Sequence, residues 1–274
     1  MWTAAQCCAS DVDLGLRDKV VLIVGATGGI GSATARRLAA EGANVALVAR
    51  GKAELTALAT DLRAGGAQAL ALVADAAAPG ALDAAVAEVT GHFGALHGLA
   101  VIAGPMGARA PFHELGDADW ESYFRCSLMI AVAACRAAIP QLSKVEGGAV
   151  VLTSAYSVRA QKPALIAYTA FKASIASMAK NLAKTYGASG VRVNCIAPGV
   201  IEKDVQNSRQ LARRYGVPQE RARYEYVRRE FGMEVALERA GRHAEFADPI
   251  AFLLSLRASY VTGAILNIDG GTDF

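Results

Sequence analysis

Tyr168 and Lys172 lie four residues apart in a stretch with helical periodicity, so a helix would carry both side chains on one face. A phenol with a pKa of about 10 is a poor acid–base group at neutral pH. A lysine ammonium beside it stabilises the phenolate and is expected to lower that pKa. Such a pair exchanges a proton with an alcohol or carbonyl oxygen while hydride passes to or from a cofactor. The same spacing also occurs on solvated helices, and its place after the fifth expected strand is what favours catalysis.

A glycine-rich turn occupies residues 25–31, after a β-branched run and before a helical stretch. Glycines permit a tight turn and let the backbone approach a pyrophosphate. The helix N-terminus then offers free N–H groups and positive potential to the phosphates. The alternative is a plain glycine-rich turn, which the strand–turn–helix context disfavours. The cofactor-binding residues expected here are Gly25, Thr27, Gly28, Gly29, Ile30 and Gly31.

Arg50, at the end of the second expected strand, bears on the choice between NAD and NADP. About 20 residues after the glycines, NAD enzymes carry a carboxylate for the ribose hydroxyl, whereas an arginine nearby accommodates the 2′-phosphate of NADP. Arg50 can form charge-assisted hydrogen bonds with that phosphate. We therefore expect NADP(H) rather than NAD(H), the alternative being that Arg50 is a surface residue. Asp75 follows the third expected strand and either meets the adenine or caps the next helix.

These residues are placed by short β-branched runs that alternate with Ala- and Leu-rich stretches of helical periodicity. The expected strands are 20–24, 44–49, 69–74, 99–103, 149–153, 191–196 and 264–268. The expected helices are 33–40, 53–64, 81–93, 117–140, 165–186 and 247–256. Strict alternation predicts the α/β class: a single-domain, doubly wound parallel sheet of the Rossmann type with helices on both faces. Ligands of that fold bind beyond the carboxyl ends of the strands.

Composition narrows the class of protein further. The 274 residues are 53% hydrophobic and 19% charged, which argues against disorder and suits a buried parallel sheet. A net charge of +3 without a long basic run predicts no nucleic-acid partner. No uninterrupted apolar run reaches about 18 residues, so no membrane span is expected.

The cysteines and histidines predict no metal site. The 5 cysteines are odd in number and match no ligand spacing, so they are expected as reduced thiols of a cytoplasmic protein. The 4 histidines also show no ligand spacing and are interpreted as structural. Residues 1–13 lack a signal-peptide pattern and are expected as a disordered tail before a domain over residues 14–274.

The order of these motifs resembles that of the short-chain dehydrogenase/reductase family over roughly residues 14–272. The matching landmarks are the glycine turn, Asp75, Ala103-Gly104, Tyr168 to Lys172, Val191 to Asn194, Pro198-Gly199, Thr262-Gly263 and Asp269 to Gly271. The resemblance implies an NADP(H)-dependent oxidoreductase that interconverts a carbonyl and a secondary alcohol, with Tyr168 as general acid–base and Lys172 on the nicotinamide ribose. It implies further cofactor contacts at Ala103, Gly104, Pro198, Gly199 and Ile201. It also implies a homo-oligomer, a tetramer or a dimer, with the last strand at the interface.

Two positions in the proton-transfer machinery depart from the family pattern. The asparagine that supports a lysine-linked water falls on Ser127, whose hydroxyl can hold a water but has a shorter reach. The serine thirteen residues before the tyrosine falls on Ala155, and Ser154 fills the role if the intervening loop is one residue longer. That role requires a hydroxyl that donates to the substrate oxygen. We expect Ser154 to supply it, the alternative being that no serine does.

Two further departures concern the cofactor contacts. The family motif Asn-Asn-Ala-Gly reads Val101-Ile102-Ala103-Gly104, which removes its polar half, and a threonine after Pro-Gly is replaced by Lys203. These departures leave two other functions open. One is a regulatory or inactive subunit that keeps the fold without redox turnover, and the other is an epimerase or dehydratase, which can share the Tyr-Lys pair.

Residues 202–242 interrupt the alternation and are expected to form a substrate lid of two exposed helices over the carboxyl edge of the sheet. This segment is rich in arginine and tyrosine: Arg209, Arg213, Arg214, Arg221, Arg223, Arg228, Arg229, Tyr215, Tyr224 and Tyr226. One interpretation is a mouth that favours an anionic substrate. The other is a solvated helical face on which Glu220, Glu225 and Glu230 pair with the arginines.

Overall fold

Seven runs of Val, Leu, Ile and Ala form one parallel sheet in the computed structural model, which describes residues 13–104, 107–203 and 205–272. The strands are β1 (Val20–Val24), β2 (Asn44–Ala49), β3 (Ala69–Val73), β4 (Gly98–Val101), β5 (Ala149–Thr153), β6 (Arg192–Pro198) and β7 (Ile265–Ile268). Their order in the sheet is β3-β2-β1-β4-β5-β6-β7, so the predicted α/β doubly wound fold is confirmed. The expected tail lies outside the described residues except for Asp13.

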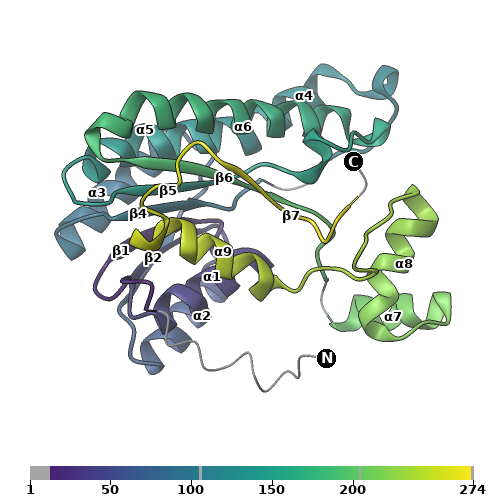
Figure 1. Ribbon diagram of the computed structural model, residues 1–274, viewed down its shortest axis with the longest axis horizontal. Helices are drawn as coiled ribbons and strands as arrows, with labels where there is room; N and C mark the ends of the chain where they lie inside the picture. The colour runs from purple at the N-terminus through teal and green to yellow at the C-terminus, as the bar shows by residue number, and fades with distance from the viewer. Residues whose placement is uncertain (1–12, 105–106, 204, 273–274) are drawn as a thin grey trace.

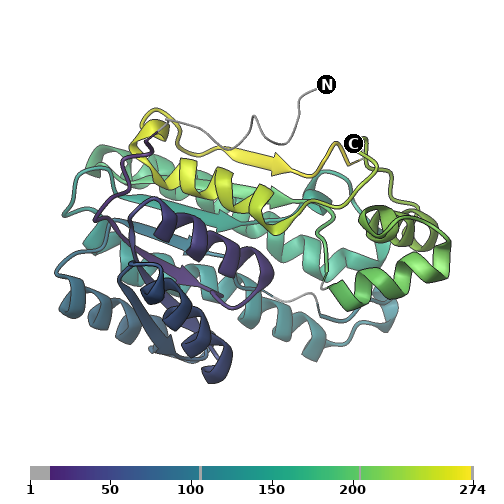
Figure 2. The ribbon, with the colours of Figure 1, turned by 90° about the horizontal axis from the view of Figure 1, so that it is seen from below.

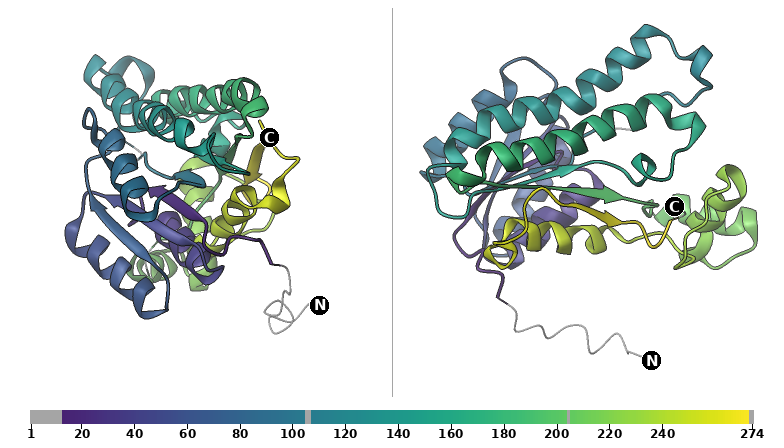
Figure 3. Two further views of the ribbon diagram at one scale, coloured as in Figure 1. Left: turned by 90° about the vertical axis from the view of Figure 1, so that its left-hand side faces the viewer. Right: turned by 45° about the horizontal axis from the view of Figure 1, so that its top comes forward.

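Helices cover both faces of this sheet (Figure 1). The helices are α1 (Gly29–Ala40), α2 (Lys52–Ala64), α3 (Ala81–Phe93), α4 (Asp117–Tyr123), α5 (Ile130–Leu142), α6 (Ile166–Tyr186), α7 (Val205–Tyr215), α8 (Gln219–Phe231) and α9 (His243–Leu254). Helices α3, α5 and α6 lie on one face and α1, α2 and α9 on the other, as the end-on view of Figure 3 also shows.

Strand β1 illustrates why the strands read as continuous apolar runs. Val20, Leu22 and Val24 pack under α3 and α5, whereas Val21 and Ile23 pack under α1 and α9. Because alternate side chains enter the two layers, every position of a central strand is buried.

The connection between β4 and β5 differs from the single helix expected over 117–140. Helix α4 continues into a π-helical segment, Phe124–Met129, and then into α5, which ends at Leu142. A π-helical turn leaves local backbone groups without their usual partners and is frequent at functional sites. The expected residue Ser127 lies in this segment.

The run Asp117–Leu142 is long and apolar enough to cross a membrane by length and composition alone. In this structure, however, the buried side chains of α5 belong to the layer formed with α3, β4 and α6. The core helix of a globular domain has the same composition, so the apolar character of this run is explained by the core.

Helices α7 and α8 stand apart from the two helical layers, beyond the carboxyl ends of the strands (Figures 1 and 2). Residues 202–242 form two helices as expected, but the expectation that both are exposed is wrong for α8. Tyr224 and Val227 of α8 are buried with Tyr156 and Met233 in a small apolar cluster of their own. Hydrophobic packing therefore attaches the lid to the segment after β5.

Candidate active site

A cavity of about 290 Å³ opens where β1 and β4 meet, the point at which the order of the sheet reverses. Crevices at this point bind ligands in doubly wound sheets. The walls hold many of the residues predicted to bind a cofactor: Gly25, Thr27, Gly28, Arg50, Asp75, Ala103 and Gly104.

The glycine turn at this cavity has the backbone that the sequence predicts. Gly25 has a φ of +89°, and a Cβ on it would lie 2.9 Å from the backbone nitrogen of Ala103. A Cβ on Gly31 would collide with the carbonyl oxygen of Gly25, so the third glycine lets α1 approach the strand. Gly28 precedes α1 in an extended conformation with no side-chain cap, which leaves N–H groups of the first turn for a ligand. This cradle fits the phosphates of a dinucleotide.

Arg50 and Asp75 are both in the wall of this cavity. Within the described part of the chain, the Arg50 guanidinium is exposed and makes no hydrogen bond or ion pair. The Asp75 carboxylate accepts a hydrogen bond from the backbone nitrogen of Ala77 at 3.1 Å, and α3 begins only at Ala81. The interpretation of Asp75 as the cap of the next helix is therefore wrong, because the carboxylate closes the turn before that helix.

A second and larger cavity, of about 670 Å³, lies between the carboxyl ends of the strands and the lid. Three residues predicted to bind the cofactor, Gly29, Gly199 and Ile201, line it. Ile30 and Pro198 are buried behind the cavity walls instead.

The Tyr168 and Lys172 side chains meet on one face of α6, as the spacing predicts. The Lys172 ammonium nitrogen lies 5.6 Å from the centre of the Tyr168 ring. It also donates a hydrogen bond of 2.9 Å to the carbonyl oxygen of Thr153, at the end of β5. Lys172 is 2% exposed, so its amine is held inside the protein, at the carboxyl edge of the sheet.

Burial shifts the acid–base behaviour of both groups. It lowers the pKa of Lys172 from 10.5 to about 8, because the charged form loses hydration. It raises the pKa of Tyr168, with smaller contributions from Tyr156 and Tyr123 that outweigh the opposing effect of Arg109. The expectation that Lys172 lowers the tyrosine pKa is therefore wrong for the ligand-free chain, in which desolvation of the phenolate dominates.

Ser127 brings a polar atom to the same place from the π-helical segment. Its Oγ is buried and has no hydrogen-bond partner among the described residues. A Cβ placed on Gly104 would lie 3.2 Å from this Oγ and 3.2 Å from the Lys172 nitrogen. A buried hydroxyl without a partner is costly, and a water that joins it to Lys172 would satisfy it.

Comparisons with known proteins agree with this geometry. The family model described as enoyl-(acyl carrier protein) reductase matches residues 25–273. The chain belongs to the short-chain dehydrogenase/reductase family. It is a family of oxidoreductases, and the relatives of this chain are dehydrogenases and reductases.

Two relatives of this short-chain dehydrogenase/reductase align over nearly its whole length. A cis-4-hydroxycyclohexanecarboxylate dehydrogenase of Sinomonas cyclohexanicum is 35% identical and covers 93% of this chain and 96% of its own. An acetoacetyl-CoA reductase of Synechocystis is 32% identical and covers 94% and 98%. A solved structure, L-sorbose reductase from Gluconobacter frateurii complexed with NADPH and L-sorbose, superposes with a TM-score of 0.86 at 30% identity over 95% and 98% of the two chains.

The hydroxyl expected from Ser154 has another partner in this member of the family. Its Oγ donates a hydrogen bond of 2.8 Å to the backbone carbonyl of Lys172 and is almost fully buried. Because a serine has a single hydroxyl hydrogen, this bond leaves none for a substrate oxygen. The neighbouring Ser157 is fully buried, where it accepts a hydrogen bond from Thr169, and it lines neither cavity. The structure thus favours the alternative in which no serine donates to the substrate.

Tyr156, of the same segment, lines the larger cavity, and its hydroxyl donates to the Met233 sulfur at 3.2 Å. It also lies close enough to Tyr168 to raise the pKa of that phenol. Sequence reasoning missed it because a tyrosine is not the residue type expected there. The one indication in the sequence was that Tyr156 directly follows Ala155, the position on which the serine of the family pattern falls.

Several charged or titratable residues of the larger cavity were not singled out from the sequence, among them Arg109 and His243, and Arg223 was considered only as one of the arginines of the lid. Arg109 comes from the loop after β4 and Arg223 from α8. His243 begins α9, and a Cβ on Gly29 would collide with its ring, so histidine and glycine turn are in contact. No single-sequence signal pointed to His243. No group of three metal-ligating side chains occurs among the described residues.

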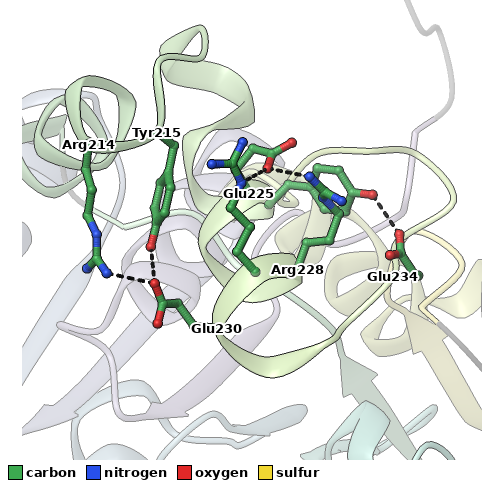
Figure 4. A network of polar contacts seen from close by, with 8 residues as sticks. Arg214, Tyr215, Glu225, Arg228, Glu230 and Glu234 are labelled. Carbon is green, nitrogen blue, oxygen red and sulfur yellow. Dashed lines mark hydrogen bonds and ion pairs between the residues drawn. The ribbon is translucent and has the colours of Figure 1, made fainter.

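Most arginines of the lid pair with glutamates, as the interpretation of a solvated face predicts (Figure 4). Arg228 and Arg229 both bind Glu225, at 2.9 and 2.8 Å. Arg214 and the Tyr215 hydroxyl both contact Glu230 at 2.7 Å. These pairs reduce the positive charge on the outer face of the lid, because each of the two glutamates is bound by one or two arginines.

Proposed function

We propose that this chain is an NADP(H)-dependent reductase that converts a small carbonyl compound and its secondary alcohol into one another. The observation that carries the proposal is the buried Lys172 amine at 5.6 Å from the Tyr168 ring, at the edge of the sheet where the glycine cradle opens. Lys172 has no carboxylate partner among the described residues, and a lysine that only served stability would not be buried in that way. Membership of the family and the NADPH-bound structural neighbour support the same reaction.

A bound nicotinamide cofactor supplies the hydride for the carbonyl carbon. Tyr168, whose pKa is raised by burial, is the protonated phenol at neutral pH and donates its proton to the carbonyl oxygen. Lys172 then supplies the replacement proton for Tyr168, and the Ser127 hydroxyl, with a water that joins it to the amine, would return a proton to Lys172. Gly199 and Ile201 bind the nicotinamide end of the cofactor, and Gly25, Gly28 and Gly31 accommodate the phosphates.

Arg50 is proposed as the residue that selects NADP(H). Arg50→Ala is expected to weaken NADPH binding about 10- to 100-fold, the effect of losing a charge-assisted hydrogen bond, while NADH binding stays within about two-fold. Parallel calorimetric titrations of the wild type and the variant with both cofactors measure this. Arg36→Ala is the control, because Arg36 is an exposed arginine that pairs with Asp61.

The same titrations test the proposed function. Tighter binding of NADPH than NADH by the wild type supports it and justifies a screen of carbonyl compounds with NADPH. Tighter binding of NADH would overturn the role of Arg50 and leave a dehydrogenase that uses NAD(H). Binding of neither cofactor would overturn the reductase and favour a fold-retaining protein without redox turnover.

We propose that Tyr156 donates to the substrate oxygen in place of Ser154. In the ligand-free chain its hydroxyl donates to the Met233 sulfur at 3.2 Å, and a thioether is a weak acceptor that a carbonyl oxygen can replace. Tyr156→Phe is expected to lower kcat about 100-fold, the usual effect of removing one donor to a developing oxyanion, and to leave the NADPH Kd unchanged. Ser154→Ala is the comparison: it removes a bond that joins β5 to α6, so it is expected to lower the Tm with a smaller loss of kcat. The reverse ranking in steady-state kinetics would return the role to Ser154.

We further propose that the chain forms a homo-oligomer through the β7 edge of the sheet. β7 is an edge strand, and its residues Ile265 and Leu266 are 48% and 39% exposed. Exposed apolar side chains on an edge strand are a liability that an interface removes. Light scattering of the purified protein measures the oligomeric state.

The free thiols Cys126, Cys135 and Cys195 support a cytoplasmic location.

A further inference from the structure

His243, the first residue of α9, lies against the glycine turn at the start of α1. A Cβ placed on Gly29 would collide with the Nε2 end of its imidazole, because Nε2, Cδ2 and Cε1 are the three nearest atoms to that position. Both residues line the larger cavity. The ring therefore occupies the space that a side chain at residue 29 would fill, and its Nε2 end reaches the first turn of α1.

Glu202 holds the other side of this imidazole. Its carboxylate accepts a hydrogen bond of 2.9 Å from the backbone nitrogen of His243, and the same oxygen lies 3.3 Å from Nδ1 of the ring. A carboxylate beside Nδ1 favours a proton on that nitrogen. The Nε2 atom has no hydrogen-bond or ion-pair partner among the described residues, and the His243 side chain is 31% exposed. This nitrogen is therefore available to a ligand in the cavity.

Donors from two helices converge at this point. The first turn of α1 has no side-chain cap, so its backbone N–H groups and the positive end of its dipole remain for a ligand. An imidazole with protons on both nitrogens adds a second positive group beside them. Two positive groups in one wall are unfavourable unless an anion lies between them. Glu202 is the one carboxylate among the described lining residues, and it lies on the Nδ1 side of the ring, so the anion that fits at Nε2 comes from a ligand.

The glycine turn borders both cavities. Gly28 lines the smaller one together with Arg50, and Gly29 lines the larger one together with His243. A dinucleotide that occupies both cavities passes this turn with its diphosphate, because that group joins its two nucleoside ends. After β6, this chain carries the exposed Lys203 where the family pattern has a threonine, so one hydroxyl near the cofactor is missing. A donor from another element can take its place.

We propose that His243 is a further cofactor-binding residue, which donates from Nε2 to the diphosphate of the dinucleotide on its nicotinamide side. The inference deepens the proposed function and rests on it. Glu202 positions the ring and accepts from Nδ1–H. Because NADPH and NADH carry the same diphosphate, His243 contributes equally to the binding of both. Arg50, in contrast, distinguishes them by the 2′-phosphate. Affinity and selectivity for the cofactor thus depend on different residues.

Calorimetric titration of the purified chain with NADPH, NADH and ADP-ribose tests this contact, and AMP is measured by its competition with ADP-ribose. His243→Ala is expected to weaken the binding of NADPH, NADH and ADP-ribose about 10-fold or more, the effect of losing a charge-assisted hydrogen bond. AMP has no second phosphate and is expected to bind within about two-fold of the wild type.

Two further variants accompany His243→Ala. His243→Gln keeps an N–H donor at the end of its side chain and is expected to restore part of the lost affinity. His113→Ala is the matched control. His113 is also a histidine beside a glutamate, with its Nε2 3.8 Å from Glu114, but it lines neither cavity. Its removal is expected to leave the binding of all four ligands unchanged.

Several results would overturn the contact: unchanged ADP-ribose binding by His243→Ala, a loss confined to NADPH, or His243→Gln binding no more tightly than His243→Ala. An equal loss for AMP would also overturn it, because the substitution would then act on the adenosine end or on the fold of the turn. Turnover separates the two proposals. Binding of both cofactors that depends on His243, without consumption of NADPH in a screen of carbonyl compounds, supports the contact and overturns the reductase. Consumption of NADPH by His243→Ala with an unchanged cofactor Kd supports the reductase and overturns the contact.

Discussion

Tyr168→Phe is expected to lower kcat for carbonyl reduction about 1000-fold while the NADPH Kd stays within about two-fold. The substitution removes one oxygen, and general acid catalysis by a placed side chain contributes about 100- to 10,000-fold. The ring remains, and with it the edge contact to the Tyr123 ring at 6.2 Å and the position above Lys172. Single-turnover kinetics with saturating NADPH measure the chemical step apart from product release.

Tyr123→Phe is the control for that experiment. The Tyr123 hydroxyl donates to the carbonyl oxygen of Ala108, so its removal perturbs the loop near the cavity without removing the proton donor. A loss of only a few-fold is expected.

Burial raises the pKa of Tyr168, so alcohol oxidation, which needs the phenolate, is expected to accelerate as the pH rises, whereas reduction does not. If Tyr168→Phe kept more than a tenth of the wild-type kcat, the phenol would not be the acid.

Lys172→Met is expected to lower kcat at least about 100-fold and to make the ligand-free protein more stable at pH 7. The pKa of Lys172 falls from 10.5 to about 8 on burial, which corresponds to about 3 kcal/mol of destabilisation while the amine is charged. The lost hydrogen bond to Thr153 offsets about 1 kcal/mol of this gain. The net gain is about 2 kcal/mol, typical of a position where function opposes stability.

The pH dependence identifies the cause of that gain. Below pH 8 the amine is charged in both the folded and the unfolded chain, so the wild type carries the full cost. Between pH 8 and 10.5 the folded chain is neutral while the unfolded chain still binds a proton, so the wild type becomes more stable and the difference from Lys172→Met shrinks. Urea unfolding at pH 7 and at pH 9.5 measures both differences.

Lys180→Met is the matched control for Lys172→Met. Lys180 lies on the same helix and also donates to a backbone carbonyl, that of Gly263 at 3.2 Å, but its side chain is exposed. No gain in stability and no loss of kcat are expected. A Lys172→Met protein that is less stable than the wild type at pH 7 would contradict the assigned cost of burying the amine.

The sequence alone determined the sheet and the machinery attached to its edge. The bounds of β1, β2, β5 and α3 agree with the predicted ranges, because a parallel strand buried on both faces must be a short apolar run between polar turns. The glycine turn was predictable for a similar reason: the steric demands at Gly25 and Gly31 admit no Cβ. The Tyr168 and Lys172 pair followed from the period of the helix.

Only the tertiary structure decided which polar side chains line the cavity and which are bonded to other groups of the protein. Ser154 and Tyr156 both carry hydroxyls near the end of β5. Packing against α6 bonds the first to a backbone carbonyl, whereas the second lies in the cavity wall with the Met233 sulfur as its acceptor. Arg223 and Arg228 are the same residue type on the same helix, α8. Arg223 lines the larger cavity, whereas Arg228 pairs with Glu225. Burial likewise reverses the pKa shift expected for Tyr168. Charge, partner and hydration depend on what surrounds a side chain, and residue type and spacing do not contain that information.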